Sequence, residues 1–276
     1  MDHKEQMKLF YEIFDASLPR LGPGDDALTQ KALSGLFSEN QKPKTDMGPR
    51  RLQVLDIGCG NGSQTLELAR RMDCEILAVD NHQPYLTELD RRAAAAGLSD
   101  KINTCLMDMS GLGREQGPFD LIWSEGALYL MGFAEGVLNP HAFRDGLQLC
   151  HDLLVPDGLL AVSELCWFRP DPPQECREFF EAEFPYMPTA EDNLGIIESC
   201  GLRLLDHFAL PESAWLDNFY RPLEERLRSM RELYAADREK LDLIEGIQME
   251  IDIYRKHSSY YGYLFFLMQR GEGQGA

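Results

Sequence analysis

The sequence predicts an α/β fold built on a doubly wound, mostly parallel sheet of seven strands, and three observations lead to it. An apolar run at 52–57 enters a glycine-rich turn and then an amphipathic helix, the layout of a nucleotide site at the mouth of a parallel sheet. Further strand-like runs alternate with helical stretches as far as residue 210, as in βαβ units. A length of 276 residues allows one large domain with an added element, or two small domains.

Charge and cysteine content narrow the classes of function. The formal net charge of −19 would repel phosphate backbones, so we expect no nucleic-acid partner. The seven cysteines form no C-x-x-C pair, so we expect reduced thiols in a cytoplasmic protein, without a disulfide framework or a metal site. The N-terminal MDHKEQMK is not a signal peptide, and no apolar run approaches the roughly 18 residues that a membrane span needs.

The glycine turn distinguishes between two kinds of nucleotide site. Its glycines follow G-x-G-x-G, and Ser63 stands where the dinucleotide pattern G-x-G-x-x-G has its third glycine. Asp56 precedes the turn, where a carboxylate repels a pyrophosphate but suits a cationic ligand. The segment Asp56–Gly62, DIGCGNG, resembles motif I of the class I S-adenosylmethionine-dependent methyltransferases. A nicotinamide-binding Rossmann domain and a plain strand-to-helix turn are the alternatives.

This resemblance covers roughly 52–270 and implies a Rossmann-like methyltransferase fold. It implies S-adenosyl-L-methionine as the cofactor and S-adenosyl-L-homocysteine as the product. It also implies that the backbone at Gly58 and Gly60 holds the methionine end of the cofactor.

The N-terminal region predicts two helices. Apolar residues at helical spacing indicate the first over 4–17, and Asp25 or Asp26 can cap a second that runs to about Phe37. Prolines and glycines exclude regular structure between them, so this stretch is a connector or a lid over the cofactor. Arg20–Gly24 favours the lid, because it resembles an R-x-G-P-G segment of the ubiquinone- and menaquinone-biosynthesis C-methyltransferases. Residues 39–51 are expected to form a polar linker.

The next two strands, 75–79 and 102–106, each lead to an acidic residue. Asp80 lies about 20 residues beyond the glycine turn, where a carboxylate can accept both ribose hydroxyls. Its alternative role is to cap the helix at 84–96. The resemblance assigns Asp108 to the adenine amino group and Met109 to the ring, the alternative being a turn-forming Asp beside a core Met.

The fourth strand, 119–123, is expected to point the next residues at the methyl donor, because ligands sit at the carboxyl ends of such strands. Glu125 could act as general base or bind a cationic amine, and Tyr129 could hydrogen-bond the acceptor. Glu125 as a plain helix-starting acid is the alternative. The segment 124–129 is neither N-P-P-Y nor D-P-P-Y and holds no Pro-Cys nucleophile, which argues further against nucleic acid bases as acceptors.

The rest of the chain predicts three more strands and several helices. A helix at 139–154, a turn at 156–158 and a strand at 159–168 resemble the L-x-P-G-G-x-L region of the family, short of one glycine. Glu164 on this strand is either a second carboxylate close to Glu125 or an acid at an interface. Four further elements are expected: helices at 174–184 and 190–200, and strands at 202–210 and 260–268.

Residues 211–256 interrupt this pattern with charged helices whose apolar stripes suit either a core or a homodimer surface. The expected division is 1–51 for the N-terminal helices and lid, 52–210 for the cofactor-binding core, 211–257 for a helical insertion, and 258–270 for the closing strand of the core.

These observations favour an enzyme that transfers a methyl group to a small-molecule acceptor. The alternative is a non-catalytic cofactor-binding or scaffold protein that uses its helical insertion for a partner. Glu125 and Tyr129 are the catalytic candidates. The candidates for cofactor contact are Arg20, Gly22, Asp56, Gly58, Cys59, Gly60, Gln64, Asp80, Asn81, Asp108, Met109, Ser124 and Glu125.

Overall fold

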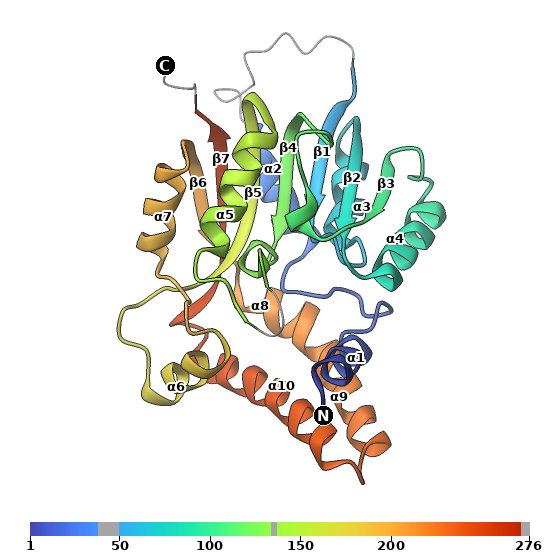
Figure 1. The fold of residues 1–276 in the computed structure, drawn as a ribbon, viewed down its shortest axis with the longest axis vertical. Coiled ribbons are helices and arrows are strands. Elements are labelled where there is room, and N and C mark those ends of the chain that lie inside the picture. The colour runs from blue at the N-terminus through green and yellow to red at the C-terminus, as the bar shows by residue number, and fades with distance from the viewer. Residues whose placement is uncertain (38–49, 134–136, 272–276) are drawn as a thin grey trace.

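The centre of the molecule is a seven-stranded sheet (Figure 1). The structure is a computed structural model that describes residues 1–37, 50–133 and 137–271. The strand order is β3-β2-β1-β4-β5-β7-β6, in which β1 to β5 run parallel and β7 is antiparallel to both of its neighbours. The predicted seven-stranded, mostly parallel sheet is therefore confirmed. The strands are β1 Leu52–Ile57, β2 Cys74–Asp80, β3 Ile102–Leu106, β4 Phe119–Glu125, β5 Leu154–Trp167, β6 Leu202–Ala209 and β7 Tyr261–Arg270.

Helices cover both faces of the sheet and its carboxyl end. One hydrophobic cluster joins α2, α3 and α4 to one face, and a second joins α5 and α7 to the other. Helices α1, α6, α9 and α10 lie beyond the carboxyl ends of the parallel strands, at the bottom of Figure 1. The α-helices are α1 His3–Ile13, α2 Asp26–Leu36, α3 Ser63–Arg71, α4 Gln83–Ala96, α5 Ala142–Leu153, α6 Gln174–Glu183, α7 Ala190–Ser199, α8 Glu212–Trp215, α9 Arg221–Leu233 and α10 Arg238–His257. Short turns η1 Met109–Gly111 and η2 Leu128–Leu130 and the π-helical η3 Leu216–Tyr220 complete them.

The largest differences between predicted and observed boundaries occur at three places. The first helix ends at Ile13 and not at 17. The fifth helix begins at Ala142, three residues later than expected. The expected turn at 156–158 is a bulge inside β5, where the pairing with β4 skips from Leu154 to Leu159 and Asp157 adopts a positive φ of 59°. The expected linker at 39–51 lies almost wholly outside the described residues.

The helical segment between β6 and β7 is joined to the N-terminal helix. Most residues of its apolar stripes are buried inside the chain, as Leu227 and Ile251 are at 0% exposure, whereas Leu233 at the end of α9 is exposed. Arg226 of α9 donates to the Glu12 carbonyl, and the Tyr234 hydroxyl donates to the Glu12 carboxylate at 2.5 Å. The stripes therefore form core between α1, α9 and α10 and the sheet edge.

Candidate functional site

The glycine turn after β1 packs tightly against three other segments. Gly58, Gly60 and Gly62 all have positive φ, at 70°, 54° and 83°. A Cβ on Gly58 would lie 2.5 Å from Ala127, and one on Gly62 would lie 2.1 Å from a Leu89 methyl group. The glycines are thus required by the protein's own packing as well as by the close approach of a ligand.

Gly62→Ala is expected to lower the free energy of unfolding by about 2–3 kcal/mol, because it combines left-handed strain with a clash. Gly97→Ala is the matched control, since Gly97 also has a positive φ, 68°, but no heavy atom within 4 Å of a Cβ. It should cost only about 1 kcal/mol, the backbone strain alone. Urea unfolding of both variants measures the difference, and equal losses would show that the Leu89 contact is unimportant.

Asp56, at the end of β1, hydrogen-bonds to the helix that follows the glycine turn. It is 0% exposed, accepts from the Thr65 hydroxyl at 2.6 Å and faces the Gln64 amide at 3.4 Å. Burial raises its pKa to about 7 against the opposing effect of the Thr65 bond, and the nearby Glu125 raises it further. Gln64 and Cys59 are buried beside it, and Gln64 also donates to the Cys59 carbonyl at 3.3 Å. These three side chains position the turn and face the protein interior.

Asp80 lies at the carboxyl end of β2, next to the turn. One carboxylate oxygen accepts from the Gly60 backbone N–H and the other from the His82 N–H, both at 2.9 Å. Each oxygen keeps a further lone pair for a ligand hydroxyl. Burial raises the pKa of Asp80, and the Tyr11 ring, stacked 3.6 Å from His82, helps to cover it. The arrangement suits a carboxylate that accepts from a vicinal diol.

The structure brings Asn81 and Asp108 to the same edge of the sheet. The Asn81 amide lies 3.5 Å from one Asp108 oxygen, and Ser110 donates to the other from its N–H at 2.9 Å and its hydroxyl at 2.6 Å. Asp108 is exposed and starts η1, while Met109 is half-buried. Asp80, Asn81 and Asp108 therefore form a continuous row of polar groups.

Glu125 is bound by the N-terminal segment. The Arg20 guanidinium donates to one oxygen at 2.9 Å and the Trp123 indole to the other at 2.9 Å. Burial raises the pKa of Glu125, and the Arg20 charge opposes this. Ser124 is buried and donates to the Ile57 carbonyl at 3.0 Å. Both side chains therefore fasten elements together, and among protein groups Arg20 keeps one buried nitrogen, Nε, without a partner.

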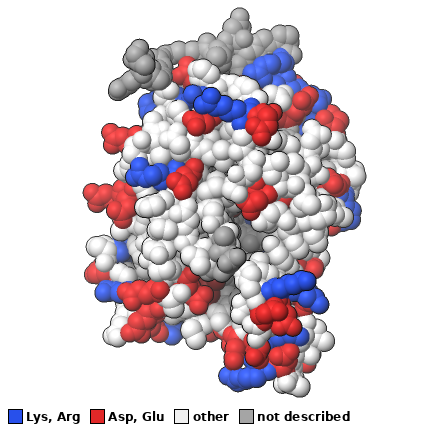
Figure 2. Space-filling view, viewed as in Figure 1, with Lys and Arg blue, Asp and Glu red and all other residues white. Residues whose placement is uncertain are grey.

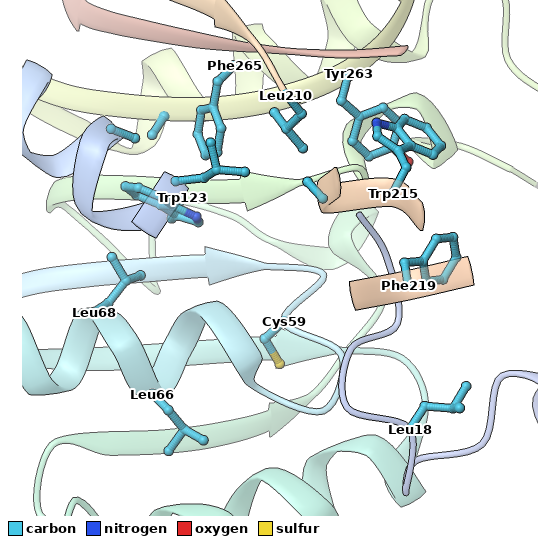
Figure 3. Packing of buried hydrophobic residues seen from close by; sticks show 14 of the residues in the cluster. Leu18, Cys59, Leu66, Leu68, Trp123, Leu210, Trp215, Phe219, Tyr263 and Phe265 are labelled. Carbon is cyan, nitrogen blue, oxygen red and sulfur yellow. The ribbon is translucent and has the colours of Figure 1, made fainter. Parts of the chain in front are cut away.

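The segment between α1 and α2 lies over the glycine turn. The Asn61 amide donates to the Ala16 and Leu18 carbonyls at 3.1 and 2.7 Å, and the Ser63 hydroxyl donates to the Pro19 carbonyl at 2.8 Å. Figure 3 shows the Leu18 backbone passing beside the turn that carries Cys59.

The helical segment holds the far side of this stretch. Asn218 donates to the Gly24 carbonyl at 3.1 Å, and the Gly24 N–H donates to Ala214. A Cβ at Gly22 would meet no atom within 4 Å, so that position is open. Asn61 and Ser63 were not predicted as contacts of this segment, because their acceptors lie more than 40 residues away in the chain.

Tyr129 lies on η2, beyond Glu125. Burial raises its pKa, and its ring contacts Phe184 with the ring centres 5.3 Å apart. Phe184 also lines a cavity of about 330 Å³. It is lined by Trp167, Arg169, Pro170, Pro172, Arg177, Phe180, Glu181, Phe184, Pro185, Met187 and Thr189. The cavity is therefore separate from the glycine turn.

The described residues contain no cluster of three or more His, Cys, Asp or Glu side chains that could hold a metal ion. None of the helices described is long and apolar enough to span a membrane. Acidic side chains are prominent on the face in Figure 2, in keeping with the net charge of −19.

The groups around the turn fit S-adenosyl-L-methionine chemically. Asp80 offers acceptors for a ribose diol, and the unpartnered Arg20 Nε offers a buried donor for a carboxylate. The nearby carboxyls of Asp56, Asp80 and Glu125 favour a ligand that carries positive charge. The Gly58 and Gly60 N–H groups donate to the Val79 carbonyl and to Asp80, so they are not free donors for a ligand.

Comparison with known families supports this assignment. Residues 54–158 match the family model described as a methyltransferase domain. The match runs from β1 to the bulge in β5, so it contains the glycine turn, Asp80, Asp108 and Glu125.

Two curated relatives are similar to part of the chain. The chain is 24% identical over 135 residues to a carboxy-S-adenosyl-L-methionine synthase of Shewanella halifaxensis, covering 48% of this chain and 52% of that protein. It is 27% identical over 120 residues to a sterol 24-C-methyltransferase of Debaryomyces hansenii, covering 44% and 29%. The match thus spans about half or less of these relatives.

A solved structure matches the whole architecture. The S-adenosylmethionine-dependent methyltransferase of Geobacter sulfurreducens, in complex with S-adenosyl-L-homocysteine, has a TM-score of 0.72 at 18% identity. The likeness covers 95% of this chain and 97% of that one. It confirms the predicted Rossmann-like methyltransferase fold.

Proposed function

We propose that this chain, which contains a class I S-adenosylmethionine-dependent methyltransferase domain at 54–158, transfers a methyl group from S-adenosyl-L-methionine to a small-molecule acceptor. The observation that carries the proposal is the position of Asp80. Its two oxygens are fixed by the Gly60 and His82 N–H groups beside a G-x-G-x-G turn, ready to accept from a ribose. A pyrophosphate would lie beside the Asp80 carboxylate, which disfavours the nicotinamide alternative.

The cofactor would be held along the carboxyl ends of β1 to β4. Asp80 would bind the ribose, Asn81, Asp108 and Met109 the adenine end, and Arg20 Nε the carboxylate of the methionine end. When bound, S-adenosyl-L-methionine supplies an electrophilic methyl group on a sulfonium. The chain's contribution is to orient and desolvate, and positioning two reactants can supply ~7–11 kcal/mol of rate enhancement.

The N-terminal segment would serve as the cover of this site. It bridges the glycine turn and the helical segment through Asn61 and Asn218, which excludes water from the space between them. Glu125 supports this cover by pairing with Arg20. This pairing favours a positioning role for Glu125 over that of a general base, while Tyr129 remains a candidate for acceptor contact.

Calorimetric titration of the full chain with S-adenosyl-L-methionine, S-adenosyl-L-homocysteine and NAD tests the proposal. We expect micromolar binding of the first two and none of NAD. Binding of NAD alone would overturn the assignment. Methyl transfer from radiolabelled S-adenosyl-L-methionine to a panel of small acceptors then tests turnover.

The subfamily, the oligomeric state and the domain division are further parts of this proposal. The R-x-G-P-G segment suggests the ubiquinone- and menaquinone-biosynthesis C-methyltransferases, whereas the relatives described above are named for other reactions. Most apolar stripe residues of α9 and α10 are buried within the chain, whereas Leu233 and Met249 are exposed and are the part of these helices that a partner or a second copy could contact. We also propose that the chain divides into the N-terminal helices and lid, the cofactor-binding core, the helical insertion and the closing strand, at 1–51, 52–210, 211–257 and 258–270.

A further inference from the structure

Two carboxyl groups, the buried Glu164 and the half-buried Glu250, lie at the carboxyl end of the sheet. Glu164 lies on β5, is 2% exposed, and its Oε1 has no hydrogen-bond partner. Glu250 comes from the opposite side, on α10, and accepts from the Tyr220 hydroxyl at 2.8 Å. In the part of the chain that the structure describes, no Lys or Arg pairs with either. Buried carboxylates are costly unless a positive partner or a proton compensates them.

A row of aromatic side chains joins these two acids. Tyr263 of β7 pairs with the residue that follows Glu164 on β5, and its ring lies 4.9 Å from the Trp215 ring, centre to centre. The Trp215 ring lies 5.7 Å from the Tyr220 ring, and the Tyr220 hydroxyl donates to Glu250. Tyr263 and Trp215 therefore lie between one acid from the sheet and one from the helical segment.

An aromatic wall completes this region. The Trp215 ring is 4.9 Å from the Tyr263 ring and 4.5 Å from the Tyr254 ring, centre to centre. The Trp215 indole is 3% exposed and its N–H has no partner. Figure 3 shows Trp215 and Tyr263 side by side, with Phe219 below them. Aromatic faces attract a cation through their quadrupole, most strongly where water is excluded.

This cluster adjoins the proposed cofactor site. A Cβ on Gly58 would lie 2.5 Å from the Ala127 side chain. A Cβ on Gly126 would lie 2.6 Å from the Tyr263 hydroxyl oxygen. The Leu128 and Tyr129 backbone N–H groups lie against the Glu164 carboxylate and lower its pKa. One short segment, 126–129, thus separates the glycine turn from the acids and rings.

We propose, resting on the methyl-transfer function above, that the acceptor is an amine, bound as its ammonium ion between Glu164 and Glu250 and against the rings of Tyr129, Tyr263 and Trp215. Glu125 does not compete for this role, because Arg20 and Trp123 already occupy its oxygens. Among the residues that the structure describes, Glu164 Oε1 has no hydrogen-bond partner.

Glu164 also has the chemistry to activate such an acceptor. Its carboxylate takes one proton from the ammonium, which frees the nitrogen lone pair. That pair forms the new bond to the methyl carbon as the carbon–sulfur bond breaks, its electron pair passing to sulfur. The products are the N-methylated ammonium, the neutral thioether S-adenosyl-L-homocysteine and protonated Glu164. Burial raises the pKa of Glu164 to about 8, so this carboxyl can hold the proton.

The test compares cations with neutral molecules of the same shape. Ethanolamine, its N-methylated forms up to choline, and the neutral choline analogue with a tert-butyl group are titrated into the full chain by calorimetry, with and without S-adenosyl-L-homocysteine. We expect at least one amine of the series to bind, and the neutral analogue to bind at least about tenfold more weakly than choline or the best amine.

Two conservative variants on different elements locate the site. Glu164→Gln and Glu250→Gln should each reduce amine affinity by about tenfold and lower the preference for cation over neutral analogue. Both variants should bind S-adenosyl-L-homocysteine with an affinity within about twofold of that of the unmodified chain. Both should also methylate the amine more slowly than the unmodified chain does. Glu198→Gln, on the exposed face of α7, is the matched control and should change nothing. Thermal unfolding followed by circular dichroism checks that each variant is folded.

The outcomes separate the two proposals. Loss of S-adenosyl-L-homocysteine binding in the unmodified chain would refute the methyl-transfer function, and the inference that rests on it. Cofactor binding with no amine bound, or with cation and neutral analogue bound equally, would overturn the amine site alone. Transfer to alcohols or phenols but not to amines would do the same.

Discussion

Replacing Asp80 by alanine is expected to weaken S-adenosyl-L-homocysteine binding about 300-fold, or by about 3.4 kcal/mol. The variant loses both charged acceptors that face the ribose and also releases the Gly60 and His82 N–H groups. Calorimetry with the purified variant measures the change. Asp80→Asn keeps one carbonyl acceptor, so its affinity for S-adenosyl-L-homocysteine should lie between those of the unmodified chain and of Asp80→Ala, at a loss of about tenfold.

Asp90→Ala is the matched control for this experiment. Asp90 lies on α4, is exposed and accepts from the Thr104 hydroxyl at 3.1 Å, so the charge change is the same. Its S-adenosyl-L-homocysteine affinity should stay within about twofold of the original. A folded Asp80→Ala variant that binds as tightly as the control would disprove the ribose assignment and return the site to its alternatives.

Replacing Arg20 by alanine is expected to lower the free energy of unfolding by about 3–5 kcal/mol. The substitution leaves Glu125 buried with Trp123 as its remaining close donor at 2.9 Å. Its pKa, already raised by burial, rises further without the guanidinium. A protein that holds a buried acid with a raised pKa becomes less stable as the pH rises through that pKa, because the acid must then carry its charge in the folded state. The loss of unfolding free energy caused by Arg20→Ala should therefore be larger at about pH 8 than at about pH 5.

Urea unfolding of Arg20→Ala, of Glu125→Gln and of the double variant measures this coupling. The double variant should be less destabilised than the sum of the two single variants, because no buried charge is left unpaired. Arg144→Ala removes an exposed arginine of α5 and should change stability by no more than about 0.5 kcal/mol. Additive losses, or a deficit that does not depend on pH, would contradict the ion pair.

Much of the fold could be predicted because local patterns determine it. The apolar run at 52–57 and the glycines after it predicted β1 and its turn, and the helix expected at 190–200 is α7, which begins at a capping box of Thr189 and Asp192. The bulge in β5 could not be predicted as such, because Pro156-Asp157-Gly158 is equally suited to a turn. The strand continues across this stretch because Leu154 pairs with β4 before it, and the residues from Leu159 onward pair with β4 and β7 after it.

The positions of site residues could be predicted where they depend on the order of the strands in the chain. They could not be predicted where they depend on contacts between distant segments. Asp80 and Asp108 follow β2 and β3, so their meeting at one edge follows from a parallel sheet. The partners of Glu125 depend on Arg20, a residue 105 positions away, and Glu250 reaches the site from a helix that has no counterpart in the motif. Neither contact leaves a local signal in the sequence, since each depends on how distant segments pack.

The position of β7 has a consequence for how the chain is made. This strand follows α10 in sequence but lies between β5 and β6, and it is hydrogen-bonded to both. While the chain emerges from the ribosome, the inner edges of β5 and β6 therefore remain without their shared neighbour until the whole helical segment has been synthesised. Unpaired strand edges invite association between nascent chains. The helices α9 and α10 thus lengthen the time during which these two edges stay unpaired in a growing chain, and a shorter helical segment would shorten that interval.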